Sequence, residues 1–189
     1  MFGGFGLVGI PENIIKALAV KGTTDHTVVS NEGGTDYFGL GLMIREGQIK
    51  KMISSYIGGN DELVRQFLTG EIEIEFIPQG TLVEKCRAGG AGIPAFYTPT
   101  GVGTMVEEGG EPIRLDHLGS GFVLKKSEPK ETRIIGGRKY IYEESIKGDW
   151  AFVKGWKGDA KGNVIFHKAA RNFNPDIAMA GRKCIVEVE

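Results

Sequence analysis

The sequence is short of cysteine, of long apolar runs and of excess charge. Its only cysteines, Cys86 and Cys184, are too few for a disulfide framework and indicate a reducing compartment. No apolar run approaches the ~20 residues of a membrane span, and Met1 is not followed by the regions of a signal peptide. The 23 Lys and Arg residues nearly balance the 24 Asp and Glu residues, which favours neither nucleic acid nor an anionic membrane as partner. We therefore expect a soluble intracellular domain.

Residues that build the commonest catalytic and metal sites are scattered. The three histidines show none of the pairing typical of a metal site, so no metal is expected. Ser54 and Ser55 have no nearby base, so no hydrolase triad is predicted. Cys86 lies in an expected helix, where a cysteine is more often a small buried apolar residue than a reactive thiol.

Glycine, in contrast, is abundant: it supplies 30 of the 189 residues, compared with a usual share of roughly 7%. The glycines fall in tight groups between apolar segments instead of in a low-complexity run. Glycine adopts positive φ and permits close backbone approach, so each group marks a place where the chain needs one of these. The glycine groups are therefore the first places to look for a functional site.

Apolar periodicity predicts short strands that alternate with helices of two to three turns. The expected helices are 11–21, 61–68 and 81–88, with Asn60 or Asp61 capping the second, and the expected strands are 27–30, 50–57 and 71–77. This order predicts an α/β fold with a mostly parallel open sheet flanked by helices and a hairpin-like insertion around 109–140. Residues 1–189 are expected to form a single domain that looks truncated at both ends.

Two glycine groups have interpretations that compete with each other. The segment from Gly4 to Gly9 matches the dinucleotide pattern G-x-G-x-x-G, but no strand precedes it and Asp25 falls before the second strand. NAD binding is therefore a weak hypothesis. The segment from Gly89 to Pro94 is either a turn set by glycine chemistry or a backbone wall that donates N–H groups to a thioester or carboxylate.

Five ordered blocks carry a resemblance to a known family. They are Gly3 to Glu12, Val29 to Asn31 with Phe38 to Leu42, Pro78 to Leu82, Gly89 to Gly101, and Ala170 to Asn174. Together they resemble family I coenzyme A transferases, and most of all the α-half of the 3-oxoacid CoA transferases. The insertion from Gly110 to Arg138 is similar to that of eukaryotic members, in which the α- and β-halves are fused.

The resemblance implies covalent ping-pong catalysis that moves CoA between succinyl-CoA and acetoacetate. A glutamate of the β-half, in a Ser-Glu-Asn-Gly segment, would form the enzyme–CoA thioester. The implied partner is therefore a β-half, fused or separate, and the full enzyme is expected to be a homodimer. Coenzyme A is a substrate here, and no cofactor, metal, nucleic acid or membrane is implied. The fused-type insertion favours the mitochondrial matrix, with the bacterial cytoplasm as the alternative.

The resemblance also implies roles for neighbouring polar residues. Ser30-Asn31-Glu32-Gly33 is similar to the glutamate segment of the β-half at first sight. The two halves share a fold, however, and the glutamate of the β-half corresponds to Asn31. Asn31 is therefore implied as the donor to the thioester oxyanion, a role typically worth roughly 3–4 kcal/mol. Glu32 would be the nucleophile only if the chain were a self-sufficient enzyme, which is the alternative hypothesis.

The remaining implied site residues would line the acyl pocket: Gln79, Gly80, Gly90, Ala91, Gly92 and Phe96. Phe96 would exclude water from the anhydride or, equally, pack in the core. The segment Arg171 to Asn174 has a structural alternative, in which it pins the last strands by hydrogen bonds. A third hypothesis is a non-catalytic domain of the same fold that binds a sugar phosphate or a nucleotide.

Overall fold

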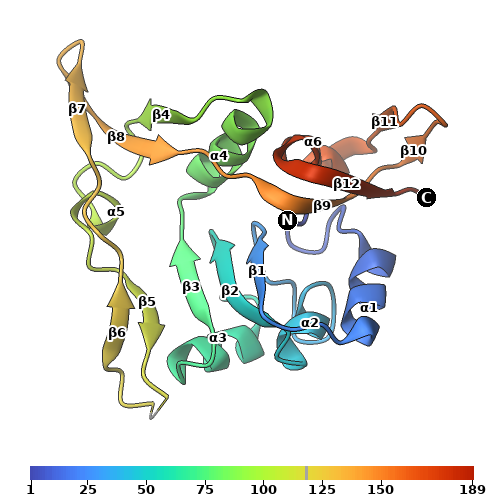
Figure 1. Cartoon of the computed structure of the whole chain (residues 1–189), viewed down its shortest axis with the longest axis horizontal. Coiled ribbons are helices and arrows are strands. Elements are labelled where there is room, and N and C mark those ends of the chain that lie inside the picture. The colour runs from blue at the N-terminus through green and yellow to red at the C-terminus, as the bar shows by residue number, and fades with distance from the viewer. Residues whose placement is uncertain (118) are drawn as a thin grey trace.

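The computed structural model describes residues 1–117 and 119–189, and its centre is a parallel sheet (Figure 1). Its strands are β1 (His26–Val29), β2 (Ile49–Ser54) and β3 (Glu73–Phe76), in the order β1-β2-β3. The register pairs Val28 with Met52 and Met52 with Ile74, which places buried side chains side by side. Helices α1 (Glu12–Lys21), α2 (Gly41–Arg45) and α3 (Asp61–Leu68) alternate with these strands. The predicted α/β architecture is confirmed.

Met1 to Gly3 connect this sheet to a second parallel pair, β9 (Gly148–Lys154) and β12 (Gly181–Glu187), through an isolated bridge between Phe2 and Phe152. Phe2 N–H donates to the Val29 carbonyl oxygen, and Gly3 N–H donates to that of Phe152, both at 2.9 Å. The rings of Phe2 and Phe152 pack with centroids 5.0 Å apart. The residues before the first glycine group are therefore held between β1 and β9 by backbone hydrogen bonds.

Two clusters of buried apolar residues pack helices on the strands, one on β1 to β3 and the other on β9. The first packs α1, α2 and α3 on the β1–β3 sheet around residues such as Ile15, Ile44 and Met52. The second packs α4 (Gln79–Ala91) and α6 (Asn174–Ala180) on β9 around Leu82, Cys86, Val153 and Ile177. The predicted helix 81–88 is therefore longer than expected, because the chain stays helical through Gly89, Gly90 and Ala91.

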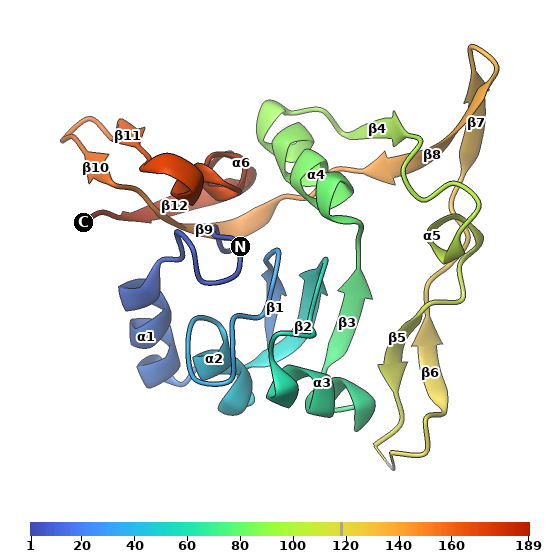
Figure 2. The same cartoon turned by 180° about the vertical axis from the view of Figure 1, so that it is seen from behind.

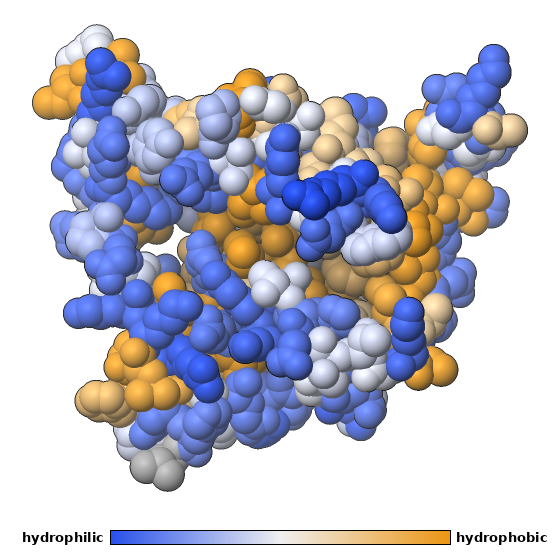
Figure 3. Space-filling model, in the orientation of Figure 1, coloured by the Kyte–Doolittle hydropathy of each residue, from blue (hydrophilic) through white to orange (hydrophobic). Residues whose placement is uncertain are grey.

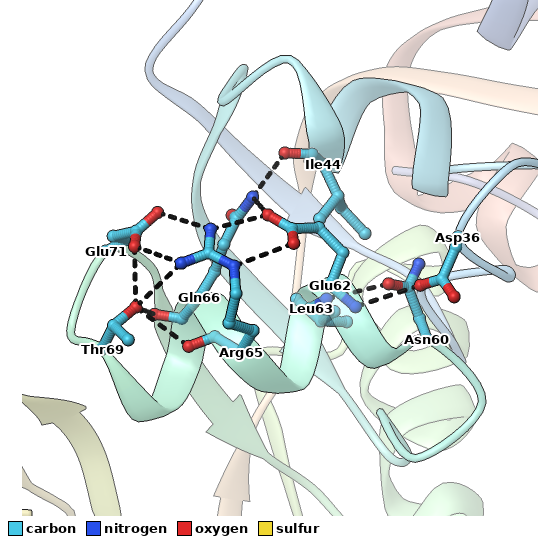
Figure 4. Close-up of polar contacts among 9 residues, drawn as sticks. All are labelled: Asp36, Ile44, Asn60, Glu62, Leu63, Arg65, Gln66, Thr69 and Glu71. Carbon is cyan, nitrogen blue, oxygen red and sulfur yellow. Dashed lines mark hydrogen bonds and ion pairs between the residues drawn. The ribbon is translucent and has the colours of Figure 1, made fainter. Parts of the chain in front are cut away.

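Helix α3 begins and ends where the sequence predicts, and its cap is Asn60 (Figure 4). Asn60 Oδ1 accepts from Leu63 N–H at 2.8 Å. Arg65 pairs with Glu62 and Glu71, and its hydrogen bonds lower the pKa of the Glu62 carboxyl to about 2. These side chains are exposed, so the network contributes little to stability, and the helix depends on its cap and its buried face.

The expected insertion is a pair of hairpins on one side of the molecule (Figures 1 and 2). The expected range around 109–140 holds β5 (Pro112–Leu115), β6 (Val123–Lys126), β7 (Thr132–Ile135) and the start of β8 (Arg138–Glu144), and it is preceded by β4 (Ala95–Thr98) and α5 (Met105–Glu108). β5 pairs with β6, and β4, β8 and β7 form an antiparallel sheet. Glu73 of β3 forms ion pairs with Arg114 and Lys125, which ties the first hairpin to the central sheet.

The last elements lie beside β9 and β12. They are the short pair β10 (Lys157–Gly158) and β11 (Val164–Ile165), the 3₁₀ helix η1 (Lys168–Arg171) and α6. No helix in the described part of the chain has the length and apolar character needed to span a membrane.

A groove of about 860 Å³ runs between β1 and β9, and its lining includes Met1, Val28, Trp150 and Ile185. Figure 3, drawn in the orientation of Figure 1, shows apolar surface at the centre of the face turned toward the viewer. The Met1 ammonium donates to the Trp150 carbonyl oxygen, and burial lowers its pKa to about 6. Asn31 and Gln79 do not line the groove, so it is separate from the polar cluster described next.

Candidate functional site

The carboxyl ends of β1, β2 and β3 bring together side chains that are far apart in the sequence. Asn31 follows β1, Ser54 and Ser55 stand at the end of β2, and Gln79 follows β3 as the first residue of α4. Parallel sheets gather ligand-binding side chains at this edge. The structure therefore brings Asn31 and Gln79, two of the predicted site residues, into one polar cluster, and Gly80 is the next residue along.

Asn31 is the centre of this cluster and is only 1% exposed. Its Oδ1 accepts from Ser55 Oγ at 2.7 Å and from Gln79 Nε2 at 3.1 Å. Its Nδ2 donates to Glu32 Oε1 at 3.0 Å. The side chain is buried among polar groups, and its amide is oriented so that the N–H bonds point toward the Glu32 side. An amide held in this way can donate to an anionic oxygen.

Glu32 is half-buried between two glycine loops. A β-carbon at position 6 would lie 3.5 Å from Glu32 Oε2, so the first loop passes directly over this carboxylate. The cavity beside it measures about 10 Å³ and is lined by Gly4, Gly34 and Gly39 among others. That volume is about one water.

The two glycine loops are nearly identical turns. Phe5 and Val8 exchange both backbone hydrogen bonds, as do Thr35 and Phe38. Each turn is followed by a glycine with positive φ, Gly9 at 68° and Gly39 at 62°. Leucine, valine and aromatic side chains avoid that region, so glycine is required at both positions.

The segment from Arg171 to Asn174 holds the first of these loops in place. Asn172 Nδ2 donates to the Val8 carbonyl oxygen, and Asn174 Nδ2 donates to that of Gly9, both at 2.9 Å. Asn174 Oδ1 also accepts from Lys154 N–H of β9. The structural interpretation of this segment is thereby favoured, although it pins a glycine loop as well as a strand.

Exposed apolar side chains lie on the loops next to the polar cluster. They come from the two glycine turns and from the end of β2: Phe5, Leu7, Val8, Tyr37, Phe38 and Tyr56, each between 43% and 65% exposed. A β-carbon at Gly39 would lie 3.5 Å from Leu7, which shows that the two turns touch. We call these six residues the apolar rim. Apolar residues gathered in this way mark a surface that meets another molecule.

The predicted pocket residues Gly90, Ala91 and Gly92 do not join the cluster. They lie at the far end of α4, about 18 Å along the helix from Gln79. A β-carbon at Gly90 would lie 2.5 Å from Met179 Cβ of α6, so this glycine serves close helix packing. The segment from Gly89 to Pro94, expected as a turn or a backbone wall, is helical through Ala91, and the chain turns only at Gly92, which caps the helix with a φ of 76°. The assignment of these residues to the acyl pocket stays a prediction. Phe96 is half-buried in β4, opposite Glu143.

The N-terminus of α1, which a bound dinucleotide would use, is already capped by a side chain of the protein. Glu187 of β12 accepts from the backbone N–H groups of Asn13 and Ile14 at 2.9 and 3.1 Å. A pyrophosphate would use these same donors. A carboxylate of the chain itself therefore caps α1, which removes the site that the G-x-G-x-x-G pattern would serve. The sequence holds no sign of this cap, because Glu187 is 174 residues from Asn13.

Other reactive groups stay away from this edge. Cys86 is fully buried in α4, and burial raises its pKa to about 12, so it behaves as the expected apolar residue. Within the described residues, no three His, Cys, Asp or Glu side chains are grouped to hold a metal. Sequence reasoning missed Ser55 because it considered this residue only as a nucleophile. The signal that could have identified Ser55 is its position directly after β2, because the carboxyl ends of β1 and β3 lie on either side of that strand.

Comparison with known proteins places the chain in a family. A family model described as coenzyme A transferase matches residues 1–189. A succinyl-CoA:3-ketoacid coenzyme A transferase 2A, mitochondrial, of Mus musculus is 51% identical over the whole chain, which covers 36% of that protein. A protein of Mycobacterium bovis, named as one subunit of a probable succinyl-CoA:3-ketoacid coenzyme A transferase, is 54% identical over 187 residues, and the chain covers 75% of it.

Solved structures agree on the fold. The acyl-CoA transferase apoenzyme of Escherichia coli O157:H7 aligns over 97% of this chain and 37% of its own, with a TM-score of 0.77 and 22% identity. The glutaconate coenzyme A-transferase of Acidaminococcus fermentans aligns over all of this chain and 60% of its own, with a TM-score of 0.74 and 21% identity. The two structures share the α/β fold, and the family model with the high-identity relatives fixes the membership. The chain belongs to the coenzyme A transferase family.

Proposed function

We propose that the chain is the α-half of a 3-oxoacid CoA transferase that moves CoA between succinyl-CoA and acetoacetate. The observation that carries the proposal is the buried Asn31 amide, oriented by Ser55 and Gln79 at the carboxyl edge of the sheet. Such a donor stabilises the negative oxygen that forms when a nucleophile attacks a thioester. The identity to relatives named for this activity supports the choice of substrates.

In the proposed reaction, a glutamate of the β-half attacks the thioester carbon of succinyl-CoA. The carbonyl oxygen becomes an oxyanion, and the Asn31 amide donates to it. The C–S bond breaks, CoA leaves as thiolate, and a mixed anhydride forms. The thiolate then attacks the glutamyl carbon, which releases succinate and leaves the enzyme–CoA thioester. Acetoacetate takes CoA by the same steps in reverse, so coenzyme A is a substrate and no cofactor is needed.

Glu32 does not fit the role of that nucleophile. Its carboxylate accepts a hydrogen bond from Asn31 and lies under the first glycine loop, beside a cavity of about 10 Å³. The resemblance aligns the glutamate of the β-half with Asn31, and Glu32 stands one residue further along the chain. We therefore assign the nucleophile to the partner half and give this chain the oxyanion donor.

The proposed partner is a β-half, as a separate chain or as the rest of a fused protein. The mouse relatives support it, because this chain covers only 36% of their length. The apolar rim supports it too, since it lies on the loops beside Glu32 and would exclude water once covered. In this proposal residues 1–189 form one domain and the complete enzyme is a homodimer. Its location would be the mitochondrial matrix in a eukaryote, which agrees with the mouse relatives' being named as mitochondrial, or the cytoplasm in a bacterium.

Turnover measured with and without a β-half tests the proposal. The isolated chain, mixed with succinyl-CoA and acetoacetate, should form no acetoacetyl-CoA above the uncatalysed rate. Addition of a β-half should restore turnover, and Asn31→Ala should then lower kcat by roughly 10²–10³. Turnover by the chain alone would contradict the proposal, and an unchanged kcat in the variant would remove Asn31 from the site.

A further inference from the structure

The orientation of the Asn31 side chain decides whether it can serve as a donor. A primary amide carries an acceptor oxygen and a donor nitrogen of nearly equal size, so a half-turn about its last torsion exchanges the two. With the oxygen turned outward, it would repel an oxyanion. The chain therefore needs a group that holds the oxygen on the inner side, so that the nitrogen, which gives one N–H bond to Glu32, can donate through its other one.

Ser55 is placed to do this, and its proton is available for it. The Asn31 backbone oxygen already accepts from Ser54 Oγ at 2.8 Å and from Ser55 N–H at 3.2 Å. A carbonyl oxygen has two lone pairs, so these donors fill it. The Ser55 hydroxyl lies 3.1 Å from that oxygen and 2.7 Å from Asn31 Oδ1. Its single proton therefore belongs to Oδ1.

The groups on the other sides of the amide agree with this assignment. Glu32 lies 3.0 Å from Nδ2, and an ionised carboxylate can only accept, so the nitrogen must face it. Gln79 also donates to Oδ1, but its side chain is exposed and has three torsions to hold. Ser55 has one torsion, and its backbone follows directly on β2. It is the more rigid of the two anchors.

We propose that Ser55 is a positioning residue for the oxyanion donor: its hydroxyl fixes the Asn31 amide with Nδ2 facing the reacting thioester. The proposal rests on the proposed function of Asn31. Ser55 touches no substrate in this account and acts through Asn31. Its effect must therefore appear in the chemical step and must vanish when the Asn31 side chain is removed.

The first experiment compares Ser55→Thr with Ser55→Val in the complete enzyme, chain and β-half together. The two variants have nearly the same shape, and only threonine keeps the hydroxyl. We expect Ser55→Val to lower kcat about tenfold, with the KM for succinyl-CoA changed less than about twofold, and Ser55→Thr to stay within about threefold of the unchanged enzyme. Equal activity of the two variants, or a loss confined to KM, would overturn the proposal.

The second experiment is a double-mutant cycle with Asn31→Ala. Ser55→Ala should lower kcat about tenfold on its own and have no further effect in the Asn31→Ala background. Ser54→Ala is the matched comparison, because its hydroxyl contacts the backbone oxygens of Asn31 and Tyr56 and not the amide. Its effect should persist in the Asn31→Ala background, as expected for a structural contact.

The outcomes separate the two proposals. Additive losses for Ser55→Ala and Asn31→Ala, or full activity of Ser55→Ala beside an impaired Asn31→Ala, would overturn the positioning role and leave the proposed function standing. Full activity of Asn31→Ala would overturn both. Circular dichroism and thermal unfolding of each variant show that the losses come from the folded enzyme.

Discussion

The two ends of helix α4 differ in a way that glycine content does not reveal. At its first turn, Gln79 donates to the buried Asn31 amide, and Gly80 has nothing within 4 Å of where a β-carbon would stand. In its last turns, Gly90 packs against Met179, and a β-carbon at Gly89 would clash with the Ile146 carbonyl oxygen. One end of the helix borders the candidate site, and the other end is part of the core.

A group of glycines therefore indicates that something lies close to the backbone. It does not tell whether that is another part of the protein or a ligand. Around Asn31, glycines with positive φ form the two turns that flank a polar cluster. In α4, helical glycines let α6 and the segment around Ile146 come close. We therefore expect substitutions at the Gly90 end of α4 to lower the free energy of unfolding. Substitutions at the Gln79 end should instead lower kcat.

The largest expected effect lies at the packing end. Lys85 of α4 pairs with Glu143 at 2.8 Å, and Lys130 pairs with the other oxygen of this carboxylate. Glu143→Ala would leave the Lys85 ammonium buried without its partner, which typically costs about 3–5 kcal/mol. Urea unfolding should show this loss, and kcat of the folded enzyme should be unchanged. Glu144→Ala, at an exposed neighbour, is the control; an equal loss there would refute the assignment to the buried pair.

A smaller loss of stability is expected for Gly90→Ala. Its β-carbon would lie 2.5 Å from Met179 Cβ, so α4 and α6 must shift apart, at about 1–3 kcal/mol. Gly80→Ala is the matched variant at the other end, where the added β-carbon meets open space and stability should not fall. If Gly90→Ala instead lowered kcat/KM and left unfolding unchanged, Gly90 would return to the acyl pocket.

Gln79→Ala should act on catalysis alone. Gln79 is exposed, so the free energy of unfolding should change by no more than about 0.5 kcal/mol. Loss of its hydrogen bond to Asn31 should lower kcat about tenfold, because the amide keeps only one anchor. Steady-state kinetics of the complete enzyme measure this. If Gln79→Ala instead lowered the free energy of unfolding and left kcat unchanged, Gln79 would have a structural role. The two ends of α4 would then not differ in function.

The smallest expected effect is that of alkylating the cysteines at pH 8. Burial raises the pKa of Cys86, in the middle of α4, to about 12, so hardly any of this thiol is ionised at pH 8, and the residue is fully buried. Cys184 is exposed. Iodoacetamide should therefore add one group, at Cys184, with turnover unchanged, as read by peptide mass spectrometry. Rapid labelling of Cys86 in the folded chain would show that α4 is not packed as described.

Sequence patterns predicted the local parts of this structure well. The spacing of Ile14, Ile15 and Leu18 predicted α1, and Asn60 followed by a helical pattern predicted the cap of α3. These features depend on neighbours within one or two turns. The resemblance also selected Asn31 and Gln79, and the structure places them within hydrogen-bonding distance.

The features that sequence patterns missed depend on distant residues. Gly89 and Gly90 favour a turn locally, but packing on α6 and the chain near Ile146 keeps them helical. The carboxylate of Glu187 caps α1 from 174 residues away, and no local motif announces it. The role inferred for Ser55 likewise required the three strand ends to be seen together.

The most direct test of the account is to trap the covalent intermediate in the complete enzyme. Incubation with succinyl-CoA, reduction of the enzyme–CoA thioester with borohydride and peptide mass spectrometry locate the modified glutamate. The account predicts a reduced glutamate in the β-half and an unmodified Glu32 in this chain. A reduced Glu32 would contradict the claim that this chain supplies the donor and its partner supplies the nucleophile.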